Sequence, residues 1–408
     1  MKFNRFALAL IEDLIDNRPP VTAILDRITE PAAQGKVAFY PCNRCSNDLL
    51  KLLKQHAPEC LVNIAGCFDQ SPDAFTEAGI DLYPLDQLPQ VASSLAAIIV
   101  TSNVFHARES EAITRLVGPA VPMVKVSGVE LELAGLDPKQ LIADIRKVLD
   151  LLADEKSRAV YLLAWLARLL NDENLTQLFA NDQDQNLVLA EGAVSYKGYR
   201  LNNLPVDIIR ELAVDIYSLG SVAAVGGDTV LDIGAFKGDT AIYFADLVGS
   251  SGRVFSFEPV QANFTDLVLN VRQNGLDDIV VPVNKGCGRS PGRLRIATAP
   301  QGSPWAFLSE ERGVEDIDVT TVDEFVAAEH LERVDFIKLD VEGVELDAII
   351  GAKKTIETFR PKMAVSLYHN LVDLTELPLM LHSMAAYNLY VRCKMAGPWS
   401  IFLYCEPR

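Results

Sequence analysis

Acidic side chains and glycines meet at the end of one apolar run of the chain. In the segment TVLDIGAFKGDTAIYFAD, an apolar stretch leads into Asp232, and Gly234 and Gly238 precede an amphipathic stretch. This pattern predicts a strand, a tight turn and a helix. Backbone at glycine can approach a ligand closely, and the free N–H groups at a helix start can bind a carboxylate. The residues predicted to line this ligand site are Asp232, Gly234, Ala235, Phe236, Gly238, Asp239 and Thr240.

A second acid, Glu258, is followed by Pro259 at the end of the next apolar run, RVFSFEP. A carboxylate at that place can accept hydrogen bonds from both hydroxyls of a ribose, which indicates an adenosine-type cofactor. A dinucleotide site would need G-x-G-x-x-G, whereas DIGAFKG gives G-x-x-x-G after an acid that would repel a pyrophosphate. S-adenosylmethionine instead brings an ammonium and a sulfonium to Asp232 and a carboxylate to the helix start. The turn therefore favours S-adenosylmethionine over NAD.

Two later apolar runs, DFIKLDVEG and KMAVSLYHN, end in residues that can move a proton. Asp340 is the first candidate for a general base, because acids at strand ends of a parallel sheet face the ligand crevice. Capping of the helix that follows is the alternative role for Asp340. His369 titrates near neutrality and is a second candidate for the base. Lys338 shares a strand face with Asp340, where it would either take part in catalysis or form a salt bridge.

The same two segments contain candidates for binding the acceptor substrate and a metal ion. Glu342 and Tyr368 are the candidates for acceptor binding, whereas Glu345 is expected to complement a helix dipole. Asp340, His369 and Asn370 together could hold a Mg²⁺ ion, which prefers oxygen ligands. Of a site with Mg²⁺ and a site without a metal ion, we favour the site without one.

The elements that must position these residues alternate between strand and helix from about Gly226 onward. Such alternation predicts a mostly parallel sheet with both faces covered. The last two apolar runs, LYVRCKM and SIFLYC, have no helix between them, so they are expected to form an antiparallel hairpin.

The earlier part of the chain predicts a second, smaller α/β domain. Short apolar runs alternate with helical patterns here too, but no G-x-G-x-x-G is present, so packing or regulation is favoured over a ligand pocket. Leu141 to Leu170 has helical spacing and would serve as a linker or as a contact in a homo-oligomer, and a hairpin is expected around Lys197-Gly198. The predicted division is residues 1–35 (helical segment), 36–140 (small Rossmann-like domain), 141–225 (helical linker and hairpin) and 226–408 (domain with the ligand turn).

Composition excludes several classes of partner. The net charge is −18 and basic residues are not clustered, which disfavours nucleic acid and anionic membranes. No apolar run is long enough to span a bilayer, and the first residues are too acidic for a signal peptide. Seven cysteines show no disulfide pattern, and Cys42 and Cys45 are expected to be inert thiols rather than a zinc or redox pair. We therefore expect a soluble, cytoplasmic protein without membrane insertion.

Residues 229 to about 369 resemble the FkbM-type family of S-adenosylmethionine-dependent methyltransferases. The resemblance rests on VLDIGAFKGDTAIYFA, VFSFEP, NVRQNG, VTTVDEF and DFIKLDVEGVELDAIIGA, in this order. It implies an α/β fold with a C-terminal Rossmann-like class I methyltransferase sheet and an antiparallel terminal hairpin, preceded by the smaller Rossmann-like domain and the helical linker.

The resemblance also implies roles for individual residues and a reaction. Asp232, Gly234 and Gly238 would form the cofactor turn, Glu258 would bind the ribose, and Asp340 would lie beside the transferring methyl group. Two departures are Phe236, where the family often has Asn, and Ser366, where many members have an acid. The expected activity is O-methylation of a small-molecule hydroxyl, on a sugar or secondary metabolite. The alternatives are an NAD-dependent oxidoreductase and a non-catalytic nucleotide-binding scaffold.

Overall fold

The computed structural model describes residues 2–42, 44–69, 80–102, 107–172, 175, 187–190, 193–202, 212, 214–298, 306–308, 315–395 and 400–408. The chain forms two compact units, Met1–Ala143 with Trp165–Leu175 and Asp144–Ala164 with Thr176–Arg408. The finer division into four parts stays a prediction. Among the described residues, no helix is both long and apolar enough to cross a membrane.

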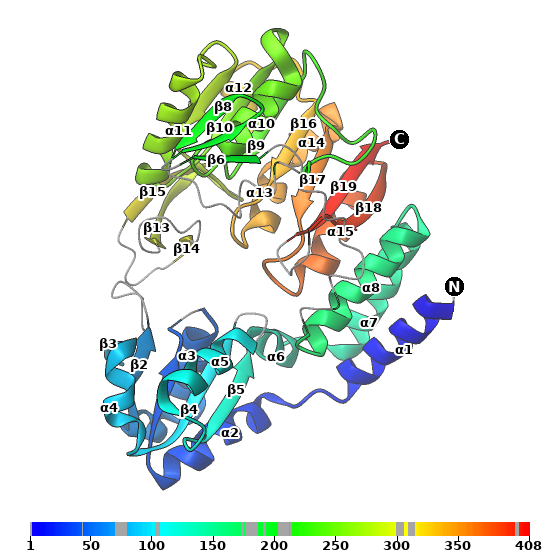
Figure 1. Ribbon diagram of the computed structural model, residues 1–408. Helices are drawn as coiled ribbons and strands as arrows, with labels where there is room; N and C mark the ends of the chain where they lie inside the picture. Colours follow the sequence, from blue (N-terminus) through cyan, green and yellow to red (C-terminus); the bar gives the residue numbers. More distant parts are fainter. Residues whose placement is uncertain are drawn as a thin grey trace. The chain divides into compact units, whose positions relative to one another are not determined.

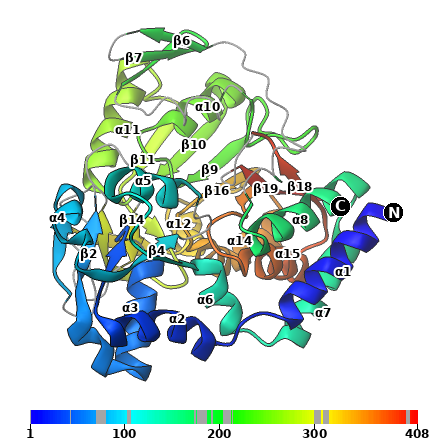
Figure 2. The same cartoon turned by 60° about the horizontal axis from the view of Figure 1, so that its bottom comes forward.

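The first unit contains a five-stranded parallel sheet with strand order β3-β2-β1-β4-β5 (Figures 1 and 2). Alternate residues of β1 point to opposite faces, so that Val37 and Phe39 join one apolar cluster and Ala38 and Tyr40 another. Helices on both faces complete the small Rossmann-like fold that the sequence predicts. The strands are β1 (Lys36–Tyr40), β2 (Ile64–Asp69), β3 (Leu82–Pro84), β4 (Leu95–Ser102) and β5 (Met123–Ser127).

The helices of this unit divide between the two faces of the sheet. Residues of α2 and α3 pack in the cluster with Val37 and Phe39, and α6 contributes to its border, whereas α4 and α5 pack on the opposite face. Ser127 caps α6 by accepting the backbone N–H of Glu130, so this strand-end hydroxyl serves the fold. The helices are α1 (Lys2–Asp16), α2 (Val21–Gln34), α3 (Arg44–His56), α4 (Leu88–Ala92), α5 (Ala107–Val117) and α6 (Gly128–Ala134).

The predicted helical segment after Leu141 is two helices, α7 (Pro138–Leu151) and α8 (Glu155–Leu169). The break occurs at Asp154, whose carboxylate accepts the backbone N–H of Ser157 at 2.7 Å and so caps the second helix. The predicted hairpin is present as β7 (Ala193–Tyr196) and β8 (Tyr199–Asn202), with β6 (Leu187–Ala190) as a third strand. Lys197 and Gly198 have φ of +48° and +92°, the backbone that a two-residue hairpin turn requires.

The second unit is built on a seven-stranded sheet with order β11-β10-β9-β16-β17-β19-β18. The first five strands are parallel, and β19 pairs antiparallel with both β17 and β18, as the missing helix between the last two runs predicts. Strand order reverses between β9 and β16, which places the crevice for a ligand at their carboxyl ends. The strands are β9 (Thr229–Ile233), β10 (Arg253–Phe257), β11 (Val280–Val283), β16 (Phe336–Leu339), β17 (Lys362–Ser366), β18 (Tyr387–Cys393) and β19 (Ile401–Pro407).

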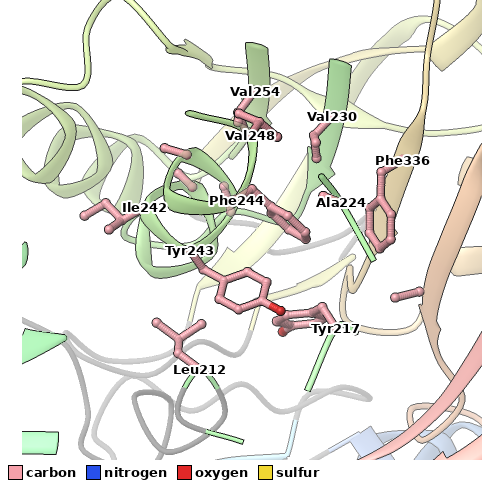
Figure 3. Close-up of a cluster of buried hydrophobic side chains, with 14 of the residues drawn as sticks. Leu212, Tyr217, Ala224, Val230, Ile242, Tyr243, Phe244, Val248, Val254 and Phe336 are labelled. Carbon is pink, nitrogen blue, oxygen red and sulfur yellow. The ribbon is translucent and has the colours of Figure 1, made fainter. Parts of the chain in front are cut away.

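Aromatic and aliphatic side chains fix the helices to this sheet. Phe244 of α10 packs against Phe336 of β16, inside a buried cluster that includes Tyr217 and Tyr243 (Figure 3). On the other face, Phe325 of α12 contacts the rings of Phe255 and Phe257 in β10. The helices are α10 (Asp239–Val248), α11 (Gln261–Gln273), α12 (Val322–Ala328), α13 (Glu345–Gly351), α14 (Lys353–Phe359) and α15 (Asp373–Met384).

A small second sheet, which the sequence reading did not anticipate beyond one arm, accompanies this unit. It has the order β12-β15-β13-β14, with strands β12 (Gly286–Cys287), β13 (Gly292–Thr298), β14 (Ala306–Leu308) and β15 (Glu315–Thr320). The α/β fold class predicted from the sequence is otherwise confirmed, including the terminal hairpin.

Candidate active site

A row of three polar side chains crosses the middle of the large sheet. Ser256, Asp232 and Lys338 occupy paired positions on β10, β9 and β16. Asp232 accepts hydrogen bonds from Ser256 Oγ at 3.1 Å and from Thr240 Oγ1 at 2.9 Å, and it lies 3.5 Å from Lys338 Nζ. Asp232 is wholly buried, and burial raises the pKa of its carboxyl although Lys338 opposes the shift. The Asp232 carboxylate therefore already has hydrogen-bond and ion-pair partners within the protein.

The glycine turn after β9 brings this strand against the loop after β16. Gly234 has φ of +88°, and a Cβ atom there would lie 1.9 Å from the carbonyl oxygen of Asp340. Lys338 Nζ donates to the carbonyl oxygen of Gly234 and so helps to hold the turn in place. Gly238, with φ of +93°, directly precedes α10 and packs against Leu267. Both glycines are therefore required by backbone conformation and by space.

Two acids border this turn. Asp239, the first residue of α10, is buried, and its Oδ1 atom has no hydrogen-bond partner among the described residues. Burial raises the pKa of its carboxyl to about 7, against the attraction of Lys338. Glu258 is also buried, accepts the backbone N–H of Val260 at 2.9 Å, and has its pKa raised to about 8, mainly by burial. An unpartnered buried oxygen beside a glycine turn is the feature expected of a ligand site.

Asp340 lies at the carboxyl end of β16 and is held by two tyrosines. Tyr368 donates its hydroxyl to Oδ1 at 2.7 Å, and Tyr217 donates to Oδ2 at 3.2 Å. The helix that follows begins at Glu345, with Val344 in the cap position, so Asp340 does not cap it. Asp340 therefore lies at the predicted edge of the sheet with both oxygens accepting hydrogen bonds.

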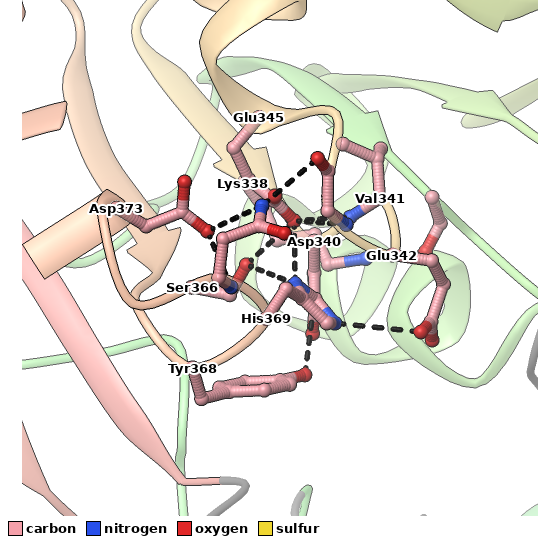
Figure 4. A network of polar contacts seen from close by, with 12 residues as sticks. Lys338, Asp340, Val341, Glu342, Glu345, Ser366, Tyr368, His369 and Asp373 are labelled. Atoms are coloured by element: carbon pink, nitrogen blue, oxygen red, sulfur yellow. Dashed lines mark hydrogen bonds and ion pairs between the residues drawn. The ribbon is translucent and has the colours of Figure 1, made fainter. Parts of the chain in front are cut away.

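His369 follows β17 and lies among carboxylates (Figure 4). Its Nδ1 atom is 2.7 Å from Glu345 Oε1, and its Nε2 atom is 3.4 Å from Glu342 Oε2 and 3.8 Å from Asp340 Oδ1. Burial would lower the pKa of this imidazole, but Glu345 and Glu342 prevail and raise it well above 6.5. Burial likewise would raise the pKa of Glu345, yet His369 and the hydrogen bonds to its carboxylate lower it to about 2.

Glu342 combines an unusual backbone with a partly buried carboxylate. Its φ is +58°, a left-handed conformation that costs a non-glycine residue of order 1–3 kcal/mol. Burial raises the pKa of its side chain, although His369 opposes the shift. Backbone strain of this kind concentrates at functional sites, and the Glu342 carboxylate here lies 3.4 Å from His369 Nε2.

Asn370, one of the three residues that the sequence suggested for a metal ion, holds neighbouring residues through its amide nitrogen. Its amide nitrogen donates to the carbonyl of Gly343 at 3.0 Å and to Asp373 at 3.0 Å. Among the described His, Cys, Asp and Glu side chains, Asp340, Glu345 and His369 have ligand atoms close enough together to converge on a cation. Glu345 Oε1 already accepts from the backbone of Val341, from Ser366 and from His369, which leaves little room for a metal at that atom.

Three residues of this network were missed from the sequence. Tyr217 is separated from Asp340 by many residues, and no motif marks it. Glu345 was expected only to complement a helix dipole, but it is completely buried and pairs with His369. Asp373, whose pKa is raised to about 7 by burial, accepts the backbone N–H of Asn370 at 2.9 Å. The acid after KLDVEG was the signal that could have identified Glu345.

Comparison with known proteins decides which family this site belongs to. A family model described as the methyltransferase FkbM domain matches residues 232–387, which include the glycine turn, Asp340 and His369. These residues match an FkbM methyltransferase domain. The resemblance drawn from the sequence motifs is thereby confirmed.

Relatives of the FkbM domain differ in how much of the chain they match. Hexuronic acid methyltransferase AglP of Haloferax volcanii is 24% identical over 144 residues, which cover 35% of this chain and 58% of that relative. The crystal structure of methyltransferase FkbM from Methylobacillus flagellatus KT covers 99% of both chains at 16% identity, with a TM-score of 0.56. The second similarity concerns the fold alone, and it extends over both compact units.

Proposed function

We propose that the chain is an S-adenosylmethionine-dependent O-methyltransferase that methylates a hydroxyl group of a small molecule. The observation that carries the proposal is the contact between the Gly234 turn and Asp340, at the carboxyl ends of β9 and β16. The turn that we propose for the cofactor therefore lies beside the carboxylate that we propose for the acceptor hydroxyl. The family match and the relative named for a hexuronic acid support a sugar-type acceptor.

The residues at the turn fit S-adenosylmethionine on two observations. Gly234 lets the loop that carries Asp340 approach the turn, since a Cβ atom there would lie 1.9 Å from the Asp340 carbonyl oxygen. Asp239 has a buried Oδ1 atom without a hydrogen-bond partner among the described residues, which a ligand could supply. Asp232 is occupied by Thr240, Ser256 and Lys338, so we assign the ammonium contact to Asp239. Glu258 would accept the ribose hydroxyls, and the N-terminal N–H groups of α10 would bind the carboxylate.

The protein's contribution to the reaction is alignment and proton removal. S-adenosylmethionine, when bound, supplies a methyl group already activated by its positive sulfur. The chain has to hold the acceptor oxygen within about 3–3.5 Å of that carbon, in line with the bond that breaks. Asp340 and His369 would bind the acceptor hydroxyl and remove its proton. A general base in this position contributes about 10²–10⁴-fold in rate. Glu342 and Tyr368 would contact the rest of the acceptor.

Calorimetry with separate ligands tests the proposal. The purified chain should bind S-adenosylmethionine and should not bind NAD. Methyl transfer from isotope-labelled S-adenosylmethionine to a panel of sugars, uronic acids and phenols should then identify an acceptor class, and Asp340→Asn should lower the rate. Binding of NAD alone would reject the assignment in favour of an oxidoreductase. Binding of S-adenosylmethionine without transfer to any acceptor would favour the scaffold alternative.

The proposed setting of the reaction is the cytoplasm. All seven cysteines are free thiols, and none forms a disulfide, which fits a reducing compartment. The acidic net charge of −18 is consistent with a small-molecule acceptor rather than a nucleic acid.

A further inference from the structure

Glu345 contacts one side of the His369 imidazole, and its carboxylate is itself held by other hydrogen bonds. Its Oε1 atom lies 2.7 Å from His369 Nδ1 and also accepts from the backbone N–H of Val341 at 3.0 Å and from Ser366 Oγ at 2.9 Å. The carboxylate is completely buried, and these donors come from the loop after β16 and from β17. Because Val341 and Ser366 hold the Glu345 carboxylate in place, Glu345 fixes the plane and direction of the His369 ring in turn.

The opposite nitrogen of the ring, Nε2, lies 3.4 Å from Glu342 Oε2 and 3.8 Å from Asp340 Oδ1. His369 Nε2 is buried and makes no hydrogen bond to any described residue, and the side chain as a whole is only 6% exposed. Figure 4 shows this edge of the ring directed toward Glu342. Nε2 thus lies beside Glu342, the residue proposed to contact the acceptor, while Nδ1 is tied to a carboxylate. This is the arrangement of a base oriented by a third group.

We infer that Glu345 is a positioning residue that holds His369 with Nε2 toward the acceptor hydroxyl, so that His369 is the proton acceptor. The inference rests on the proposed function and deepens it. As the acceptor oxygen forms its bond to the methyl carbon, the carbon–sulfur bond breaks with its electron pair left on sulfur, and the hydroxyl proton goes to Nε2. His369 afterwards releases that proton to solvent, while its Nδ1–H continues to donate to Glu345.

Asp340 is less suited to accept the proton. Both of its oxygens already accept hydrogen bonds, from Tyr368 and from Tyr217. An acceptor hydroxyl at either oxygen would therefore share that oxygen with a tyrosine donor. Asp340 therefore helps to bind and orient the acceptor, and His369 removes the proton.

The charges around His369 give the inference a pH signature. Glu342 and Asp340 face it from the loop after β16, Glu345 from α13 and Asp373 from α15. These acids favour the protonated ring, whereas a base must be neutral. The rate should therefore rise with pH through a midpoint above 6.5, and removing the charge of Glu345 should move that midpoint down.

Nitrogen-15 NMR of selectively labelled histidine tests the positioning without any acceptor. In wild type, the His369 signal should titrate above pH 6.5, and its neutral form should carry the proton on Nδ1. Glu345→Gln keeps the size of the side chain and removes its charge, so the His369 titration should shift to lower pH. Asp347→Asn is the matched control, because Asp347 lies on the same helix and its side chain is 44% exposed beside Arg289. A His369 titration and tautomer unchanged in Glu345→Gln would overturn the inference.

Kinetics with an acceptor found in the transfer experiment completes the test. Glu345→Gln should lower kcat by about 10- to 100-fold with little change in acceptor KM, because an orienting contact is lost. In both proteins, the acidic midpoint of the pH–rate profile should match the NMR titration midpoint of His369. If Glu345→Gln leaves the acidic midpoint of the rate profile unchanged, the inference is overturned. Failure of S-adenosylmethionine binding in wild type would instead count against the proposed function, so the two failures are distinguishable.

Discussion

Lys338 Nζ lies 3.5 Å from Asp232 Oδ1, and both side chains are buried at the centre of the large sheet. The pair is extended by hydrogen bonds from Thr240 and Ser256 to Asp232 and from Lys338 to the carbonyl of Gly234. This arrangement connects β9, β10 and β16 below the ligand crevice. The lysine therefore supports the glycine turn, which is the salt-bridge alternative considered for it from the sequence.

Replacing Lys338 by methionine should destabilise the protein by about 3–5 kcal/mol, because Asp232 would remain buried without its counter-charge. Urea unfolding measures the loss. Lys353→Met is the control, since the Lys353 side chain is 60% exposed and its pair with Glu357 is worth little. A loss below about 1 kcal/mol in Lys338→Met would contradict the role of the pair.

Gly234→Ala should impair both folding and cofactor binding. The added Cβ would lie 1.9 Å from Asp340 O, and the backbone has φ of +88°. We expect about 1–2 kcal/mol from the left-handed backbone and a further 1–3 kcal/mol from the forced separation of the two loops. Gly275→Ala separates these effects, because Gly275 has φ of +65° but open space around its Cβ position. Thermal unfolding and calorimetry should show weaker S-adenosylmethionine binding only in Gly234→Ala.

Asp239→Asn should weaken binding of S-adenosylmethionine by about 10- to 100-fold, which corresponds to the loss of a charge-assisted hydrogen bond. Binding of 5′-methylthioadenosine, which lacks the amino-acid part, should stay within about threefold of wild type. The comparison separates a direct ammonium contact from damage to the fold. Equal losses for both ligands would show that Asp239 supports the turn rather than the ammonium.

The same substitution should stabilise the ligand-free protein at neutral and alkaline pH. Burial raises the pKa of Asp239 to about 7 in the folded state, above its ordinary value of 3.8. The folded state therefore binds the proton more tightly than the unfolded state, and stability falls as pH rises from about 4 to about 7. Asn carries no such proton, so the difference between variant and wild type should grow over that range. Denaturant unfolding at pH 5 and pH 8 checks the sign.

The alternation of strands and helices sufficed to predict the two largest sheets, because short apolar runs alternate with longer helical patterns in both parts of the chain. The terminal hairpin followed from the missing helix between β18 and β19. The glycine turn could be located because a positive φ and a close approach of backbone both require glycine, and Gly234 and Gly238 stand at these positions. In the small sheet of β12 to β15, the sequence indicated only the arm at β13, and β12 and β14 are only two and three residues long.

The contacts between side chains of the site were harder to predict than the places of these residues in the fold. The sequence places Asp340 and His369 at strand ends, but their contacts depend on tertiary packing. Tyr217 reaches Asp340 from a distant segment, and Glu345 turns inward although the first turn of a helix is usually exposed. Asp232 was assigned to the ligand because its type suited an ammonium, and only the register of β9 with β10 and β16 reveals how many protein partners it has.

Glu258→Gln should weaken S-adenosylmethionine and 5′-methylthioadenosine alike, because both ligands carry the ribose. Burial raises the pKa of Glu258 to about 8, so the carboxyl of the free protein holds its proton at neutral pH. Ionisation improves its acceptance of ribose hydroxyls, and the affinity of wild type for 5′-methylthioadenosine should therefore increase as pH rises from 7 to 9. The glutamine variant should show no such increase and should bind about 10-fold more weakly at pH 9, in keeping with one lost hydrogen bond to a charged group. The thioether has no amino group to titrate in this range, so the pH dependence belongs to the protein. An affinity for 5′-methylthioadenosine that is flat with pH in wild type would place the ribose away from Glu258.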